Sequence, residues 1–327
     1  MFKDLLKVKN IKKFIKRYGI IYLTFRYIQG LVQPTVPSMK FFHRALYQCC
    51  LNIISYKIKN LQMVPLEITH AGDVYIEMND GIKLFYNPHY ESNQYTEGDG
   101  QGLEFGSANK YGEIEKFLSG YMKNGMSYFD IGANNGYFYS LKLAKKFPDA
   151  KIYAFEPDPK ISYHFEKNII KNSIRNIKIE NIALAEIDAE DALLTRDLGA
   201  NGYLLRTKNS KVEAIQVKCK KFDTYINENK IDKVDIIKVD IEGGELNFLR
   251  GSRGAIELYR PILILEVNDL FLRRSMGSKG ELLQFFQGLD YLFFEFENDV
   301  LAIPSHQRLE LANLMLAFKN RQINKIE

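Results

Sequence analysis

The chain has 327 residues, 46% of them apolar and 26% charged, a composition typical of a folded protein with a sizeable core and not of a disordered chain. Its net charge of +5 is unevenly placed, because residues 1–60 hold twelve Lys or Arg and one acid, Asp4, so this segment carries +11 and the remainder −6. The mildly acidic remainder excludes nucleic acid as the expected partner, since proteins that bind nucleic acid present basic surfaces.

The three cysteines, Cys49, Cys50 and Cys219, lack the spacing of a zinc site and do not indicate a disulfide framework. Reduced thiols are typical of a cytoplasmic protein, which is the location that we predict. The first residues carry charge throughout and do not resemble a signal peptide. The apolar stretch at residues 20–32 is too short for a transmembrane helix and contains Arg26.

Residues 1–65 differ from the rest in composition, and we predict a basic helical extension there, followed by a domain of residues 66–327. Apolar residues between Phe2 and Ile15 recur at helical spacing, with lysines between them. A basic amphipathic helix can lie on an anionic membrane, so the extension predicts peripheral membrane contact. The alternative is an ordinary helix whose apolar stripe packs on the rest of the protein.

A hairpin is predicted over residues 73–86, where Asn-Asp-Gly supplies the turn between two alternating stretches. The polar, glycine-rich residues 87–112 are predicted to form a loop of the kind that often carries substrate contacts. A short helix is predicted from Glu113 to Met122.

From Met126 onward, strands and helices alternate. Strands made of continuous Ile, Leu, Val and Phe are buried on both faces, as in a parallel sheet, and their alternation with helices predicts a doubly wound α/β fold. The predicted strands are residues 126–131, 151–156, 177–186, 234–241 and 261–267, and the predicted helices are 137–147, 158–172 and 245–259. A hairpin within residues 188–232 interrupts this order, and two further strands are expected at 290–299 and 313–320.

A glycine loop, Asp130-Ile-Gly132-Ala-Asn-Asn-Gly136, stands where the first of these strands ends. Ligands of a doubly wound sheet bind beyond the carboxyl ends of its strands, and glycines let the backbone turn sharply close to a ligand. Glu156 ends the second strand, twenty residues after Gly136. A carboxylate at that place can accept both hydroxyls of a ribose.

Two cofactors use such a loop. A nicotinamide dinucleotide places its pyrophosphate on the helix N-terminus with Gly-x-Gly-x-x-Gly spacing, but position 134 is Asn, and Asp130 would repel an anion. S-adenosylmethionine has a ribose, no phosphate and an amino group that Asp130 would attract. The loop therefore favours S-adenosylmethionine over a dinucleotide.

Three segments, in this order and spacing, resemble the FkbM family of S-adenosylmethionine-dependent methyltransferases: DIGANNGYF, YAFEPDP and DIIKVDIEGGELNFLRGSRGAIELYRPILILEV. The resemblance covers about residues 70–320 and leaves out the basic extension. It implies a Rossmann-like methyltransferase sheet whose last strand runs antiparallel. It also implies O-methylation, because members of this family typically act on hydroxyls of sugars, polyketides or other secondary metabolites.

Carried over position by position, the resemblance implies roles for individual residues. The methionine part of the cofactor would be held by Asp130, Gly132, Asn134 and Gly136. Glu156 would bind the ribose, and Ala183 with its neighbours would flank the adenine.

Methyl transfer to a hydroxyl needs in-line approach to the sulfonium and a group that takes the proton. Asp240, where the fourth strand ends, is the first candidate for this base, and Glu242 is the second. The alternative of a magnesium site made by Asp240 with Glu266 or Asn268 is not favoured, because strand ends in this fold collect acids anyway, so no metal is predicted. Glu245 is better explained as an acid that complements the dipole of the next helix.

Together these inferences predict an enzyme that O-methylates a sugar hydroxyl in a glycan or glycolipid precursor, as part of polysaccharide biosynthesis. Its expected partners are this small-molecule or glycan substrate and a membrane surface contacted through the basic extension. Two alternatives stay open. One is a methyltransferase fold without catalysis that acts as a binding module in a glycan-assembly complex, and the other is O-methylation of a secondary metabolite.

Overall fold

The structure is a computed structural model. It describes residues 66–68, 74–78, 80–86, 112–195, 204–205, 214–273, 277–296 and 299–307. The chain divides into two compact units, Met1–Asn79 and Asp80–Glu327. The predicted extension, the predicted loop after the hairpin except for its last residue, and the predicted strand at 313–320 lie outside the described residues. These three remain predictions, as does the domain boundary after residue 65.

Both strands of the predicted hairpin are present. In the first unit, β2 (Val74–Glu77) runs antiparallel to β1 (Leu66–Ile68). In the second unit, Gly81 has a φ of 74°, as an Asn-Asp-Gly turn requires, and β3 (Lys83–Tyr86) follows. The side-chain oxygen of Asn168 accepts the backbone N–H of Phe85 at 2.6 Å, which fixes β3 to the helix that carries Asn168.

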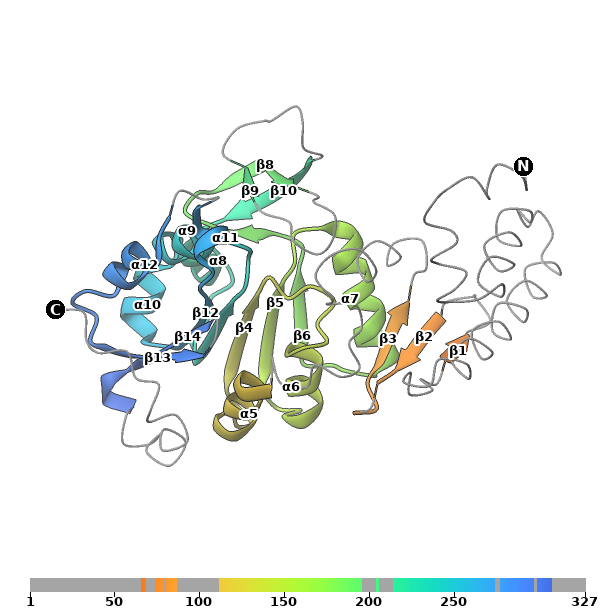
Figure 1. Ribbon diagram of the computed structural model, residues 1–327. Helices are drawn as coiled ribbons and strands as arrows, with labels where there is room; N and C mark the ends of the chain where they lie inside the picture. Colours follow the sequence, from red (N-terminus) through yellow and green to blue (C-terminus); the bar gives the residue numbers. More distant parts are fainter. Residues whose placement is uncertain are drawn as a thin grey trace, which may run out of the picture. The chain divides into compact units, whose positions relative to one another are not determined.

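The main sheet of the second unit has seven strands in the order β13-β14-β12-β11-β4-β5-β6 (Figure 1). The parallel strands are β4 (Ser127–Ile131), β5 (Lys151–Phe155), β6 (Ile177–Glu180), β11 (Ile236–Val239) and β12 (Ile262–Glu266). The last strand, β14 (Asp299–Pro304), lies between β12 and β13 (Tyr291–Phe296) and is antiparallel to both. This confirms the predicted doubly wound sheet with an antiparallel last strand. The strand β14 itself was not predicted.

Apolar side chains cover both faces of this sheet. Phe129 and Ile237 belong to one core, and their neighbours Tyr128 and Ile236 belong to the other. The first core is closed by α8 (Phe222–Glu228), α9 (Glu245–Gly251), α10 (Arg253–Tyr259) and α12 (Lys279–Phe285). The second is closed by α5 (Gly112–Tyr121) and α6 (Ser140–Lys146). Burial on both faces explains the continuous apolar runs in the sequence.

The remaining helices are short except for α7 (Pro159–Lys171). Asp158 caps α7 by accepting the N–H of Lys160 at 2.8 Å, and Pro159 occupies the first turn, where its missing N–H costs nothing. A single turn, α11 (Asp269–Leu272), follows β12, and the 3-10 turn η2 (Ser305–Gln307) follows β14. None of the described helices has the length and apolar character needed to cross a membrane.

The prediction of one strand over residues 177–186 is wrong. β6 ends at Glu180, and β7 (Ala183–Leu184) belongs to a different sheet. The side chain of Asn181 donates to the carbonyl oxygens of Glu156 and Pro157 at 2.7 and 3.0 Å, which draws the chain over the end of β5 and away from its strand path.

The prediction of one helix over residues 245–259 is also wrong, because α9 and α10 are separated at Ser252. The buried hydroxyl of Ser252 donates to the carbonyl oxygen of Leu249 at 3.1 Å. Such local bonds compete with the helical hydrogen-bond pattern.

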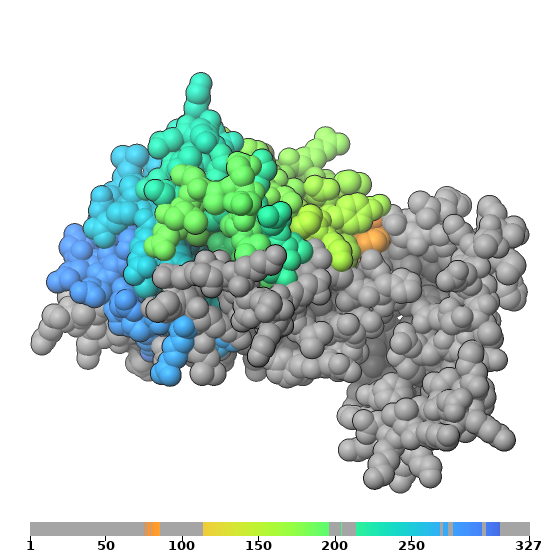
Figure 2. Space-filling model, turned by 90° about the horizontal axis from the view of Figure 1, so that it is seen from above, coloured from red at the N-terminus to blue at the C-terminus, as the bar shows by residue number. Residues whose placement is uncertain are grey.

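A second, smaller sheet has the order β7-β10-β8-β9. Its strands β8 (Ala189–Thr195) and β10 (Ala214–Lys220) are antiparallel, which confirms the hairpin predicted within residues 188–232, and β9 (Leu204–Leu205) pairs with β8. Figure 2 shows the green and teal atoms of this sheet on the face seen from above.

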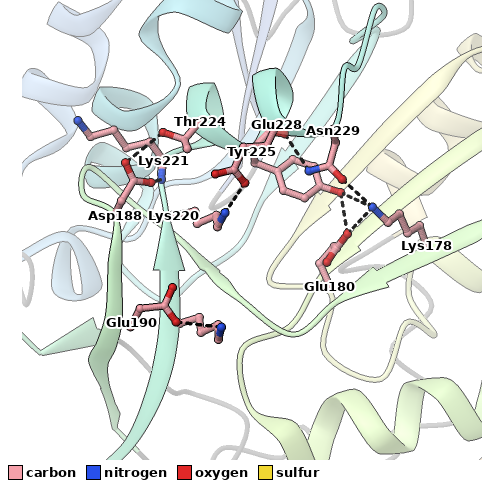
Figure 3. Close-up of polar contacts among 11 residues, drawn as sticks. Lys178, Glu180, Asp188, Glu190, Lys220, Lys221, Thr224, Tyr225, Glu228 and Asn229 are labelled. Carbon is pink, nitrogen blue, oxygen red and sulfur yellow. Dashed lines mark hydrogen bonds and ion pairs between the residues drawn. The ribbon is translucent and has the colours of Figure 1, made fainter.

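Polar contacts surround α8 where it meets the two sheets (Figure 3). On β6, Lys178 forms an ion pair of 2.7 Å with Glu180, and the hydroxyl of Tyr225 on α8 donates to Glu180 at 2.9 Å. Just before β8, Asp188 accepts the backbone N–H of Lys221, which precedes α8, at 2.9 Å. These contacts hold the smaller sheet and α8 to the edge strand of the main sheet.

Candidate active site

The glycine loop begins where β4 ends and crosses the end of β5. The N–H groups of Gly132 and Ala133 both donate to the carbonyl oxygen of Phe155, at 3.0 Å. Gly132 and Gly136 have φ values of 83° and 78°, in the left-handed region that favours glycine. The two glycines therefore fix the path of the loop, as the sequence predicted.

Gly132 also permits a close approach between the loop and the end of β11. A Cβ atom at position 132 would lie 1.9 Å from the carbonyl oxygen of Asp240. Only a residue without a side chain fits there. The contact brings together the predicted cofactor loop and the first candidate for the catalytic base, which are more than one hundred residues apart in the chain.

Glu156 is tied to this loop by its carboxylate. Its Oε2 accepts the N–H of Asn134 at 3.0 Å, and its Oε1 accepts the N–H of Asp158 at 2.9 Å. Burial raises the pKa of Glu156 to about 7, against the effect of these two N–H groups, and the charge of Asp158 adds to the rise. Each carboxylate oxygen can accept a second hydrogen bond, so the group still fits a ribose with two hydroxyls.

Asp130 lies inside the protein at the end of β4. Its side chain is 2% exposed, and its Oδ2 accepts a hydrogen bond from the hydroxyl of Ser140 at 2.5 Å. Burial raises the pKa of Asp130, although the charge of Lys238 and the bond from Ser140 oppose the rise. The sequence analysis missed Ser140. The predicted contact of Asp130 with the cofactor amino group remains a prediction.

Ala183 is buried in β7, beyond the end of β6, where it pairs with Cys219 of β10. The predicted position near the end of the third strand is therefore approximately right, but Ala183 belongs to the smaller sheet. Its role beside the adenine remains a prediction.

Asp240 follows the last residue of β11 and forms an ion pair with Lys238, whose Nζ lies 2.7 Å from Oδ2 of Asp240. The two partners differ in exposure, since the side chain of Lys238 is 3% exposed and that of Asp240 is 31% exposed. The sequence analysis gave Lys238 no role. The sequence feature that could have indicated a role for Lys238 is its position as a single charge within the apolar run Ile-Ile-Lys-Val.

Glu242 and Glu266 lie near Asp240, and one carboxylate oxygen from each of the three is within 4.8 Å of the others. Oxygen atoms at such distances could hold a divalent cation. Burial, helped by the charge of Asp240, raises the pKa of Glu266 to about 10. The ion pair with Lys238 offsets the charge of Asp240. That no metal binds here remains a prediction.

Glu245 has a structural explanation. Its Oε1 accepts the N–H groups of Ile241 and Gly243 at 3.1 and 3.2 Å, which closes the turn that contains Glu242. Glu245 lies in the first turn of α9, which is the position where an acid complements the helix dipole.

Taken together, the site fits S-adenosylmethionine. The loop from Gly132 to Gly136 offers backbone without bulky side chains, and Glu156 offers a buried carboxylate for the ribose. Asp240, whose side chain is partly exposed, lies beside the loop, and Glu242 follows it in a partly exposed turn. The geometry thus places a cofactor loop next to candidate proton acceptors.

Comparisons with known proteins agree with this geometry. Residues 130–293 match the model of the methyltransferase FkbM domain. Among curated proteins, Methyltransferase 1 of Beauveria bassiana is 26% identical over 141 residues, which are 37% of this chain and 56% of that protein. Methyltransferase sdnD of Sordaria araneosa is 29% identical over 167 residues, which are 41% of this chain and 64% of that protein. The chain thus matches less than two thirds of either relative's length.

Among solved structures, methyltransferase FkbM of Methylobacillus flagellatus is 18% identical and has a TM-score of 0.39, covering 66% of this chain and 50% of that one. The putative methyltransferase SMU.1697c of Streptococcus mutans, solved with S-adenosylhomocysteine, is 11% identical and has a TM-score of 0.35, covering 59% of this chain and 98% of that one. With TM-scores below 0.5, neither structure bears on the function.

Proposed function

Because this chain belongs to the FkbM family of S-adenosylmethionine-dependent methyltransferases, we propose that it O-methylates a hydroxyl of a sugar in a glycan or glycolipid precursor. The observation that carries the proposal is the contact of Gly132 with the backbone of Asp240. It joins the cofactor loop to a carboxylate that is partly open to solvent.

Each residue of the site then has a chemical task. The cofactor, when bound, supplies an electrophilic methyl group. Glu156 holds the ribose hydroxyls, and the loop from Gly132 to Gly136 positions the methionine part. Asp240 receives the proton that the acceptor hydroxyl gives up, and Glu242 is the second candidate for this role.

The nature of the acceptor is the less direct part of the proposal. Support for a sugar comes from the sequence resemblance and from the basic extension, which suits docking at a membrane where lipid-linked glycans are assembled. A secondary metabolite is the second candidate, because residues of this chain are 26% identical over 176 residues to the AMB antimetabolite synthetase AmbE of Pseudomonas aeruginosa, of which they cover 8%.

The test uses the purified full chain with S-adenosylmethionine and two acceptor panels, one of nucleotide sugars and lipid-linked sugars and one of phenolic and polyketide alcohols. Formation of S-adenosylhomocysteine is measured. We expect turnover with the sugar panel and a fall of about 100-fold or more in Asp240→Asn, the range for loss of a general base. The control is Asp232→Asn, an exposed acid before β11, which should keep full activity.

The outcomes separate the alternatives. Turnover with the second panel alone would replace the sugar by a secondary metabolite. Tight cofactor binding without turnover on either panel would favour the binding module in a glycan-assembly complex.

Membrane docking is tested separately. We expect deletion of residues 1–30 to weaken binding to anionic liposomes and to leave binding to neutral liposomes unchanged. Equal binding of the deleted and full-length chains to anionic liposomes would contradict the docking.

A further inference from the structure

Lys238 is a buried cation in an otherwise apolar strand. Its neighbours on β11, Ile236, Ile237 and Val239, are fully buried apolar residues. Because side chains alternate between the faces of a strand, Lys238 points to the face of Ile236, which α5 and α6 cover. An ammonium group loses its hydration there, whereas an apolar side chain of similar length would fill the space without that cost. Packing therefore does not explain this lysine.

Acidic and aromatic groups surround the lysine. Besides the ion pair with Asp240, its Nζ lies 4.8 Å from the centre of the Tyr139 ring. Lys238 is also opposite Asp130 in the register of β11 and β4. Burial alone would lower the pKa of Lys238, but the charges of Asp240, Tyr139, Asp130 and Asp299 outweigh it and raise the pKa above its usual value. These neighbours therefore favour the charged form of Lys238.

In this ion pair, Lys238 is buried and Asp240 is partly exposed to solvent. An acceptor can reach the carboxylate of Asp240 but not the ammonium group of Lys238, which is only 3% exposed. Lys238 can therefore act on the acceptor only through its neighbours, of which Asp240 is partly exposed and Asp130 is buried.

We propose that Lys238 is the positioning residue of the methyl transfer. Its ammonium group fixes the orientation of the Asp240 carboxylate and keeps it charged, ready to receive the acceptor's proton. Lys238 also faces Asp130 at the start of the glycine loop. One cation therefore orients the proton acceptor and stabilises the end of the strand that carries the cofactor loop. This inference rests on the proposed role of Asp240.

The chain offers a closely matched control. On β6, Lys178 and Glu180 are also two residues apart and also form an ion pair of 2.7 Å, but the side chain of Lys178 is 51% exposed (Figure 3). Lys178 takes no part in the proposed site. A substitution at Lys178 thus removes an ion pair of the same spacing and length and leaves Asp240 untouched.

The experiment follows the ionisation of Asp240 directly. The full chain is labelled with ¹³C at the aspartate carboxyl carbon and saturated with S-adenosylhomocysteine, and the Asp240 signal is identified by its loss in Asp240→Asn. We expect the titration midpoint of Asp240 to rise by about 1–3 pH units in Lys238→Met, the usual effect of losing an adjacent opposite charge. Lys238→Arg should restore most of the wild-type midpoint, and Lys178→Met should not change it.

An unchanged midpoint in Lys238→Met, or an equal rise in Lys178→Met, would overturn the proposal. Should Lys238→Met fail to fold, Lys238→Gln removes the charge and keeps a polar donor, and the same comparison applies. Where an acceptor is available, Lys238→Met should lower kcat about tenfold or more and leave the KM for S-adenosylmethionine nearly unchanged. A purely structural role would instead lower thermal stability and leave the pH profile of kcat/KM in place.

The titration needs only S-adenosylhomocysteine and no acceptor. A shifted midpoint combined with no turnover of the wild-type chain on either acceptor panel would therefore count against the proposed function and not against the coupling of Lys238 to Asp240.

Discussion

The backbone N–H of Asn134 lies 3.0 Å from Oε2 of Glu156, although the two residues are 22 positions apart in the chain. The cofactor loop and the acid predicted to bind ribose are therefore one hydrogen-bonded unit. Because Oε1 of the same carboxylate accepts the N–H of Asp158, the acid also fixes the start of α7. A change at Glu156 should consequently affect both the ribose contact and the shape of the loop.

Removal of this carboxylate should weaken cofactor binding strongly. We expect Glu156→Ala to lower the affinity for S-adenosylmethionine roughly 10- to 100-fold, since hydrogen bonds to a charged group contribute about 1.5–3 kcal/mol. Calorimetric titration with S-adenosylmethionine, S-adenosylhomocysteine and NAD measures this, and NAD should not bind. An unchanged affinity in a folded variant would remove Glu156 from the cofactor site.

The affinity for S-adenosylmethionine should depend on pH. In the free protein the pKa of Glu156 is about 7, and ribose hydroxyls donate to the ionised form, so binding lowers this pKa. Affinity is therefore fully present above pH 7 and should fall by up to about tenfold per unit below it. Glu156→Gln, which cannot ionise, should bind weakly with little dependence on pH between 6 and 8. A wild-type affinity that is constant over this range would contradict the prediction.

The close approach at Gly132 can be separated from its backbone conformation. Gly125 has a φ of 81°, close to the 83° of Gly132, but no atom lies within 4 Å of a Cβ built on Gly125. Gly125→Ala should cost about 1–2 kcal/mol in stability, the price of a left-handed residue. Gly132→Ala should cost roughly 1–3 kcal/mol more, because its Cβ also meets the carbonyl of Asp240. Denaturant unfolding measures the free energy of unfolding of both variants. Equal losses in the two variants would show that the contact between position 132 and the Asp240 carbonyl does not affect stability.

Glu266 should make the protein less stable at high pH. Its pKa of about 10 lies above the ordinary glutamate value, so its neutral form favours the folded state. This contribution is full at pH below about 4.5 and is lost as the pH rises toward 10. Glu266→Gln, which stays neutral, should have a Tm that is higher than that of the wild type by several degrees at pH 8 and by much less at pH 5. Thermal melts of wild type and variant at both pH values measure this difference. A variant whose Tm does not rise at pH 8 would contradict the raised pKa of Glu266.

Chelation should leave the activity intact. The carboxylates of Asp240, Glu242 and Glu266 are close enough to share an ion, but Lys238 already offsets the charge of Asp240, and burial raises the pKa of Glu266. We expect EDTA to change turnover less than twofold. Loss of activity with EDTA that added Mg²⁺ restores would mean that these carboxylates hold a metal, and the role of Lys238 would then need to be reconsidered.

Much of this fold could be read from the sequence because its strands carry their own pattern. The runs that became β4, β11 and β12 are mostly apolar, with Asp130 and Lys238 as charged exceptions, and burial on both faces explains this pattern. The alternation with helices then gave the doubly wound class. The strand β14 was missed, although its pairing with β13 is local, because its place beside β12 depends on contacts that are distant in the chain.

The candidate site was readable only in part, for a similar reason. Gly132 and Glu156 stand at strand ends, where glycine and acid types point to a ligand. The partners Ser140 and Lys238 carry no such signal, because their importance comes from the distances to Asp130 and Asp240. The breaks at Asn181 and Ser252 likewise depend on single side-chain hydrogen bonds that override an apolar pattern.

The place of β14 has a consequence for biosynthesis. The ribosome releases β12 before β14, so the edge of β12 has no neighbour until residues 299–304 have been made. An apolar strand with an open edge is prone to pairing with other chains. The completion of this half of the sheet must therefore wait until after β13 and β14 leave the ribosome exit tunnel, and chaperones that shield exposed strands should bind nascent chains that end before β14.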